Sequence, residues 1–289
     1  MTFVPAEEWR AGGDFFDWRG HRIFGRADGE GPPVLLIHGF PTSSWDWSGL
    51  WPTLRARHRL LTLDMIGFGL SAKPRRFGYS IGAQADLFEA YLVRQGVTHY
   101  TILAHDYGDT VAQELLARHR DRTATARIDA VCLLNGGLFP ETHRALPVQR
   151  LLQSPLGPLL ARLTGYRQFA ASMRRICARP MEDRELRTMW QLIDENDGRA
   201  VMPKLIGYMA ERRRHRERWV GALVAADAPV RLIDGLDDPV SGAHMVARYR
   251  ELVPSPDIIE LPGVGHYPQL EAPAAVLTAV GDFLRTTTA

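Results

Sequence analysis

The sequence has little cysteine, since Cys132 and Cys177 are the only two among its 289 residues. Two cysteines are too few for a disulfide framework. Cys132 lies in the apolar run AVCLL, which is typical of a small core residue. Because proteins without disulfides predominate in reducing compartments, we expect a cytoplasmic location.

Long hydrophobic runs are also absent. No segment approaches the roughly 18 apolar residues that a membrane-spanning helix needs. The N-terminal stretch MTFVPAEEWR lacks the apolar core of a signal peptide. We therefore expect a globular protein with no obligatory membrane association.

No excess of one charge is present either, because 35 basic and 33 acidic residues leave a net charge of +2. This balance argues against nucleic acid as a partner. One basic cluster, ERRRHRERW, includes Arg212 to Arg218. We interpret it as a solvated helix face interrupted by two glutamates, with a patch for an anionic membrane or a partner protein as the alternative.

Features of cofactor sites are missing as well. The histidines are scattered without the spacing of metal ligands, and no glycine-rich phosphate loop is present. We expect no metal, no organic cofactor, and a monomer or a homodimer.

Short apolar runs alternate with longer amphipathic stretches along most of the chain. The runs predict strands at residues 21–26, 34–38, 59–64, 100–104, 130–134, 230–234 and 258–261. The amphipathic stretches predict helices at residues 80–95, 111–119 and 243–252. Alternation of this kind predicts an α/β fold, in which helices flank a mostly parallel sheet.

The alternation breaks between about residues 139 and 219, where no strand is predicted and prolines and glycines interrupt short helical patterns. We therefore expect residues 139–225 to form a helical cap. Residues 1–138 and 226–289 would form the two parts of the core.

The stretch TILAHDYGDTVAQELLARH joins a predicted strand to a predicted helix at Asp106. Ala104 and Gly108 stand two residues to either side, which is the small-x-nucleophile-x-glycine spacing of a nucleophile elbow. Such an elbow presents its central side chain at the carboxyl end of the sheet, where ligands bind. The alternative is that Asp106 only caps the helix.

Three further stretches supply partners for Asp106. His266 in LPGVGHYPQLEAP follows a predicted strand, and so do Asp237 and Asp238 in VRLIDGLDDPV. The order nucleophile, acid, histidine is that of the α/β hydrolases. In that fold the turn HGFP would place the backbone N–H of Phe40 in an oxyanion hole, together with the N–H of Tyr107.

Six stretches resemble the α/β-hydrolase superfamily in its branch with an aspartate nucleophile: HGFPTSSWDW, LDMIGFGLSAKP, AHDYGDTVAQELLAR, NGGLFPETHR, RWVGAL and GHYPQLE. More closely, they resemble the mesoderm-specific transcript protein family, from about Gly31 to the C-terminus. The resemblance implies an α/β-hydrolase fold with the cap inserted after the sixth strand. Counted from Gly235, it implies Asp238 as the acid, ahead of Asp237, with His266 as the base.

An aspartate at the elbow favours attack on a saturated carbon that bears a leaving group. A carboxylate is ionised at neutral pH and needs no base before it attacks. The product would be an ester on Asp106, which water activated by His266 would hydrolyse. Relatives with this aspartate are mainly epoxide hydrolases and haloalkane dehalogenases, so we expect a hydrolase that acts on a small apolar organic substrate.

The residues around the site favour an epoxide. Tyr107 and Phe40 stand where many dehalogenases have tryptophan and asparagine, which bind the halide. The predicted cap offers two tyrosines as acids for an epoxide oxygen, Tyr208 by its spacing to Pro229 and, with weaker support, Tyr166. Haloalkane dehalogenation is the first alternative, and ligand binding without turnover is the second.

The pocket between sheet and cap should set the choice of substrate. We expect His38, Phe40, Trp45 and Trp190 to line it. Asp109, where epoxide hydrolases commonly have glycine, either favours the helix dipole or perturbs the nearby nucleophile.

Overall fold

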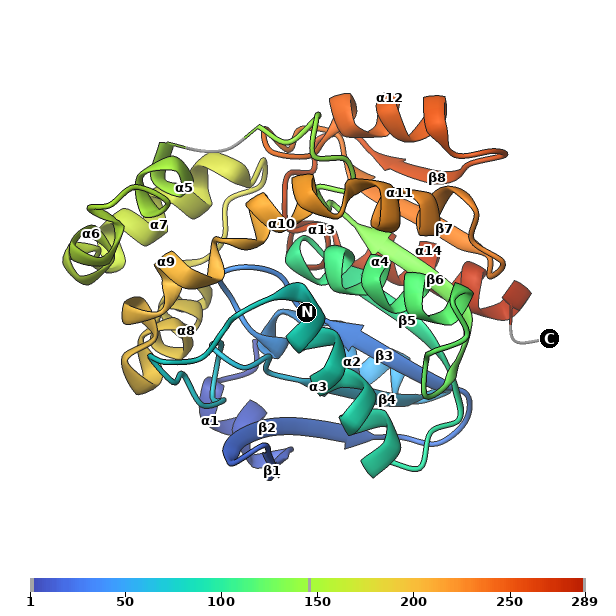
Figure 1. Ribbon diagram of the computed structural model, residues 1–289, viewed down its shortest axis with the longest axis horizontal. Helices are drawn as coiled ribbons and strands as arrows, with labels where there is room; N and C mark the ends of the chain where they lie inside the picture. The colour runs from blue at the N-terminus through green and yellow to red at the C-terminus, as the bar shows by residue number, and fades with distance from the viewer. Residues whose placement is uncertain (1–2, 145–146, 288–289) are drawn as a thin grey trace.

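The computed structural model describes residues 3–144 and 147–287 and contains one eight-stranded sheet (Figure 1). Its strand order is β1-β2-β4-β3-β5-β6-β7-β8. The bounds are β1 Asp14–Trp18, β2 His21–Asp28, β3 Pro33–Ile37, β4 Arg59–Leu63, β5 His99–His105, β6 Arg127–Leu134, β7 Val230–Gly235 and β8 Asp257–Leu261. Neighbours from β4 to β8 pair in parallel, which confirms the predicted fold class.

The seven predicted strands are all present, but β1 was not predicted. It pairs antiparallel with β2 through a two-residue turn at Arg19 and Gly20, which both have positive φ. Turns of this kind usually contain Asn-Gly or Asp-Gly, so Arg-Gly is a weak signal. The acidic residues Asp14 and Asp17 further obscure the alternation of this short strand.

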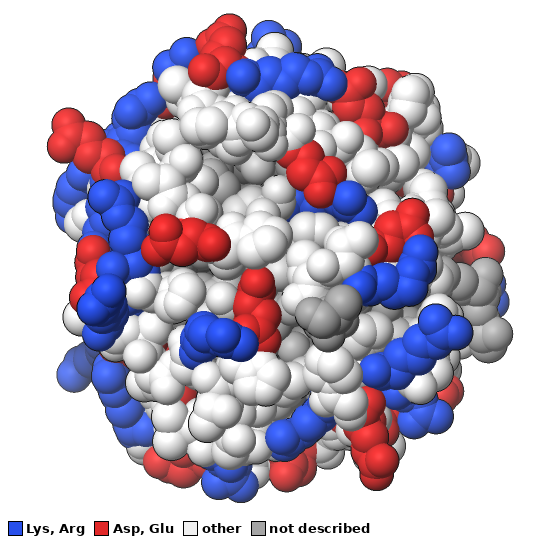
Figure 2. Space-filling view, turned by 90° about the vertical axis from the view of Figure 1, so that its right-hand side faces the viewer, with Lys and Arg blue, Asp and Glu red and all other residues white. Residues whose placement is uncertain are grey.

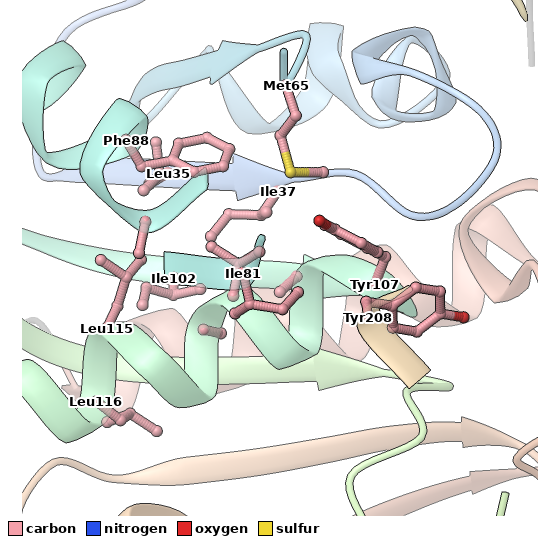
Figure 3. Packing of buried hydrophobic residues seen from close by; sticks show 14 of the residues in the cluster. Leu35, Ile37, Met65, Ile81, Phe88, Ile102, Tyr107, Leu115, Leu116 and Tyr208 are labelled. Atoms are coloured by element: carbon pink, nitrogen blue, oxygen red, sulfur yellow. The ribbon is translucent and has the colours of Figure 1, made fainter. Parts of the chain in front are cut away.

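Both faces of the sheet are covered, because successive side chains of β3 enter different clusters. Leu35 and Ile37 pack with the helices of one face, and Val34 and Leu36 with those of the other. Figure 3 shows the first cluster. The first face carries α3 Ile81–Arg94, α4 Tyr107–Arg120, α11 Arg216–Val224 and α12 Ala243–Leu252, and the second carries α1 Ala6–Ala11, α2 Trp51–Leu54 and α14 Pro273–Thr287.

Between β6 and β7 the described residues form helices and no strand. They are α5 Pro147–Leu152, α6 Gly157–Leu163, α7 Tyr166–Ile176, α8 Asp183–Asp194, the 3-10 helix η2 Glu195–Ala200, α9 Met202–Leu205, α10 Tyr208–Arg214 and α11. In Figure 1, α5 to α9 lie to one side of the sheet, whereas α10 and α11 return across α4. The division of the chain at residues 138 and 225 stays a prediction.

The functional side chains lie at one edge of the sheet. The segments that follow β3, β5, β7 and β8 carry Phe40, Asp106, Asp238 and His266. Because the carboxyl ends of parallel strands meet at one edge, residues more than 200 positions apart in the sequence become neighbours.

Candidate active site

Asp106 lies on a strained turn between β5 and α4. Its φ of 49° and ψ of −106° are rarely adopted by a residue with a side chain. Its carboxylate accepts no capping hydrogen bond from α4, so it does not act as a helix cap. The turn is possible because Gly108 lies against β3, where a Cβ atom would approach the Ile37 carbonyl oxygen to 2.5 Å. The backbone therefore turns the carboxylate away from the helix.

The two oxygens of Asp106 have different surroundings. Oδ2 accepts a hydrogen bond from the Phe40 N–H at 3.0 Å, as the oxyanion-hole prediction requires. Oδ1 lies 4.0 Å from Nε2 of His266. Tyr107, the second expected donor, begins α4, where backbone N–H groups have no partner within the helix. Oδ2 therefore lies at the predicted oxyanion hole, and Oδ1 lies on the side of His266.

His266 is oriented by Asp238. Its Nδ1 donates to Oδ2 of Asp238 at 2.7 Å, which leaves Nε2 facing Asp106. Asp238 is buried and also accepts from the Val240 and Ser241 N–H groups. Asp237, the other residue considered for this role, is exposed.

These contacts change the protonation of the pair. Burial alone would lower the pKa of His266, but the charge and hydrogen bond of Asp238, and then the charge of Asp106, raise it to about 9. Burial likewise works to raise the pKa of Asp238, and the charge and hydrogen bond of His266 bring it below its ordinary value. His266 is therefore protonated at neutral pH and lies between the carboxyl groups of Asp238 and Asp106.

His105, directly before Asp106 in the sequence, holds the loop that carries His266 in place. Its Nε2 donates to the carbonyl oxygen of His266 at 2.7 Å. Burial, followed by the charge of His266, lowers the pKa of His105 to about 4, so its ring is neutral. The elbow and the histidine loop are therefore held together directly.

Arg212 is a residue of the site that the sequence analysis missed. Its Nη2 lies 4.0 Å from Oδ1 of Asp106 and donates to the Asp106 carbonyl oxygen at 3.2 Å. Its Nε donates to Oγ1 of Thr110 at 2.7 Å. The side chain is almost completely buried, so α10 supplies a cation beside Asp106.

The prediction of a solvated helix face is therefore wrong for Arg212, because the packing of α10 on α4 buries this side chain. The neighbouring Arg216 and Arg218 form exposed or half-buried ion pairs, with Glu141 and with Glu114 and Asp121 respectively. The sequence offers one hint, the spacing of four residues between Tyr208 and Arg212, which places both on the same helix face.

The structure separates the two candidate tyrosines. The Tyr208 ring packs 4.9 Å from that of Tyr107 and 6.1 Å from that of Phe40, between ring centres, and the two tyrosine hydroxyls point apart (Figure 3). The buried Tyr208 hydroxyl has no hydrogen-bond partner of ordinary geometry among the described residues. Burial, and then the charge of Asp106, raise the pKa of Tyr208.

Tyr166 lies outside the site. Its hydroxyl donates to the carboxylate of Asp183 at the protein surface. Tyr166 begins α7 and Asp183 begins α8, so this hydrogen bond joins the two helices at their N-terminal ends. The expectation that Tyr166 serves as an acid is therefore wrong, because its surface hydrogen bond directs the hydroxyl away from Asp106.

A cavity of about 570 Å³ opens at Asp106 and is lined mainly by apolar side chains. Its wall includes Asp106, His266, Phe40 and, from the cap, Trp190 and Phe169. Tyr208 is not part of this wall but lies behind Phe40. Volume and lining suit a small organic molecule.

Trp45 and His38 do not line this cavity, contrary to our expectation. The Trp45 indole donates to the Val4 carbonyl oxygen at 2.8 Å, and its ring packs against Phe3 from the N-terminal segment. His38 is buried under Phe68 and accepts from the Met65 N–H at Nε2. Both were placed near the site by their position in the sequence, but their side chains point into the core.

Asp109 is buried near Asp106, in the first turn of α4. Its carboxyl lies against the backbone of Gly136, where a Cβ atom would approach Oδ2 to 2.1 Å. Burial, and then the charge of Asp106, raise the pKa of Asp109 well above its ordinary value. Asp109 therefore adds no negative charge beside Asp106 at neutral pH.

The described part of the chain offers neither a metal site nor a membrane-spanning helix. It contains no group of three histidine, cysteine or acidic side chains placed to hold a metal ion. None of its helices is long and apolar enough to cross a membrane.

The chain belongs to the alpha/beta hydrolase fold family, which matches residues 32–273. Within it, the chain is 41% identical to the mouse mesoderm-specific transcript protein, over 96% of this chain and 87% of the relative. It is 40% identical to LipZ of Mycobacterium tuberculosis, over 96% and 98%. These similarities confirm the resemblance to the mesoderm-specific transcript protein family.

More distant similarities point to the same superfamily. Haloalkane dehalogenase 2 of Mycobacterium tuberculosis is 26% identical, over 92% of each chain. A crystal structure of an alpha/beta hydrolase fold protein from Burkholderia ambifaria matches with a TM-score of 0.80 and 27% identity, over 93% of this chain and 97% of that one. The protein is thus a hydrolase of the α/β-hydrolase superfamily with relatives among the haloalkane dehalogenases.

The pair of His266 and Asp238 predicts a pH dependence of stability. The pKa of His266 is about 9 in the folded protein and near 6.5 in the unfolded chain. The contribution of His266 to the free energy of unfolding is therefore complete below pH 6.5 and is lost as the pH rises through 9. We expect the free energy of unfolding to fall, over this range, by on the order of 3 kcal/mol more in the wild type than in His266→Gln. Urea unfolding of both proteins at a series of pH values measures this loss. An equal loss of the free energy of unfolding in the wild type and in His266→Gln would contradict the prediction.

Arg212 predicts a second effect on stability. Arg212→Met removes the cation beside the buried Asp106 and the hydrogen bond to Thr110, so we expect a loss of roughly 3 kcal/mol. Arg213→Met, on the exposed side of the same helix, should change stability by less than about 0.5 kcal/mol. Denaturant unfolding compares the two variants, and similar losses would show that Arg212 has no special role.

Proposed function

We propose that the protein hydrolyses a small apolar epoxide to a diol through a covalent ester on Asp106. The observation that carries this proposal is the difference between the two oxygens of Asp106. Oδ2 accepts a hydrogen bond from the Phe40 N–H, and Oδ1 lies 4.0 Å from Nε2 of His266. A reducing, cytoplasmic location and a monomeric or homodimeric state are parts of the same proposal.

The first step forms the ester. Oδ1 of Asp106 attacks an epoxide carbon in the cavity, the carbon–oxygen bond of the ring breaks, and the departing oxygen takes a proton. A fixed elbow lowers the entropic cost of bringing carboxylate and carbon together. The apolar wall of the cavity favours a hydrophobic substrate and excludes water from this step.

The second step hydrolyses the ester. Once Asp106 is esterified, it no longer carries the charge that helps to raise the pKa of His266. The imidazole then loses its proton more readily and accepts one from water, which attacks Cγ of the ester. The negative charge develops on Oδ2, where the Phe40 N–H already donates, and such a donor is typically worth about 3 kcal/mol in the transition state. The Cγ–Oδ1 bond then breaks, the departing alkoxide takes the proton held by His266 and leaves as the diol, and Asp106 passes its own proton back to His266. The proton that His266 lost earlier restores the acid of the first step.

Tyr208 is the acid that this proposal assigns to the departing oxygen. Burial, and then the nearby charge of Asp106, raise the pKa of its hydroxyl. Among the described residues this hydroxyl has no hydrogen-bond partner of ordinary geometry. A hydroxyl in this position stays protonated at neutral pH and remains available as a donor. Substrate entry must bring it into contact, since Tyr208 packs near Phe40 and does not itself line the cavity.

A second candidate function is haloalkane dehalogenation, which the similarity to haloalkane dehalogenase 2 favours. The first step would then release a halide ion and need no acid. Trp190, which lines the cavity, offers an indole N–H to such an ion. Tyr107 offers no side-chain N–H beside the nucleophile, and this is the main reason to prefer the epoxide.

A panel of epoxides and haloalkanes, scored for diol and for released halide, separates the two functions. We expect diol without halide, and none with Asp106→Ala. Tyr208→Phe should slow diol formation at least about 100-fold, because it removes a general acid. Tyr166→Phe is the matched control and should retain full activity, since Tyr166 lies at the surface.

The contrary results have distinct meanings. Halide release that survives Tyr208→Phe would replace the first function by the second. Diol formation with equal losses in both tyrosine variants would remove Tyr208 from the mechanism while leaving the epoxide proposal in place. No product from any substrate would contradict both functions.

A further inference from the structure

The outer surface of α5 and α6 exposes apolar side chains. Among the described residues, five large apolar side chains are exposed, and four of them are Leu151, Leu156, Leu159 and Leu163, at 45–68%. The fifth, Val93, lies on α3. Soluble surfaces rarely gather such side chains without an interaction partner.

The leucines of α6 are not needed to hold the helix in place. Leu156, Leu159 and Leu163 are spaced by three and four residues and therefore share one face. The helix makes its inner contacts through Gly157 and Ala161, which are buried. The exposed leucines thus form a stripe that the fold leaves without a partner.

This stripe leads to the mouth of the cavity. Leu151 is 45% exposed and also lines the cavity wall, so the same side chain belongs to both surfaces. Thr164 directly follows the stripe and lines the cavity as well, as do Gln168 and the exposed Arg175. Leu151 and Thr164 therefore place the exposed leucines beside the cavity that holds Asp106.

The same segment of the chain is rich in positive charge, and Arg175 lines the cavity. Residues 142–181 contain seven arginines and no lysine, aspartate or glutamate. Within the described chain, Arg150, Arg162, Arg167 and Arg175 are exposed and form no ion pair. On the side of the molecule away from α5 and α6, by contrast, Figure 2 shows both charges interspersed.

We propose that this face, made of the four leucines and the four unpaired arginines, docks reversibly on an anionic phospholipid surface. Arginines attract acidic headgroups, and leucines between them enter the boundary of the acyl chains. The docked cap would take apolar substrate directly from the lipid into the cavity. A second copy is a poorer occupant, because two faces rich in arginine repel each other.

Sedimentation of the purified protein with phosphatidylcholine vesicles, with and without phosphatidylglycerol, tests this proposal. We expect binding that requires phosphatidylglycerol and weakens at high salt. Arg162→Gln with Arg167→Gln should weaken binding about 25-fold, at roughly fivefold per arginine. The triple variant Leu156→Ser, Leu159→Ser, Leu163→Ser should weaken it at least tenfold.

The matched control removes two exposed arginines elsewhere. Arg213→Gln with Arg214→Gln changes the net charge equally but lies on α10, so binding should weaken less than about threefold. Circular dichroism and turnover of any water-soluble substrate found in the panel show that the variants remain folded. Because vesicle binding is measured without turnover, its outcome does not depend on the proposed function.

Three results would overturn the proposal. The first is wild-type protein that does not sediment with phosphatidylglycerol at low salt. The second is equal weakening by the control and by Arg162→Gln with Arg167→Gln. The third is a homodimer that the leucine variant converts to a monomer without any vesicle binding, which would assign the face to a second copy.

Discussion

Asp106 is buried with its carboxyl group among charged side chains, and the rest of the site depends on this constraint. The proposed attack on carbon requires that this group stay charged. Burying an unpaired ion costs several kcal/mol. Around Asp106 the protein places two cations, Arg212 and His266, each 4.0 Å from Oδ1, and a backbone N–H on Oδ2. Asp238 balances His266 from the other side, and the adjacent Asp109 is kept neutral. Positive and negative charges therefore alternate through the site.

The fold and the chemical core of the site could be predicted because they rest on local patterns. Asp106 lies where a strand meets a helix between small residues, and Asp238 and His266 each follow a strand, so parallel pairing alone brings them together. The structure also decides between the adjacent Asp237 and Asp238 by burying only the second.

The cap could not be predicted equally well, because its side chains are placed by packing between distant helices. Tyr166 and Tyr208 were both expected to serve as acids, with the better support for Tyr208, yet Tyr166 bonds Asp183 at the surface and Tyr208 packs on Tyr107. Arg212 is one of several arginines in a short run and becomes a partner of Asp106 only when α10 docks on α4. The cap thus contributes to the site through α10, while α5 and α6 face outward beside the cavity mouth.

The central claim is that Asp106 forms a covalent ester, and single turnover in oxygen-18 water tests it most directly. Excess protein would be mixed with an epoxide that it hydrolyses, and product and protein would be analysed by mass spectrometry. The account predicts an unlabelled product after one turnover and a label in the peptide that contains Asp106, because water attacks Cγ of the ester. A label in the product and none in Asp106 would show that water attacks the substrate directly, and would contradict the account.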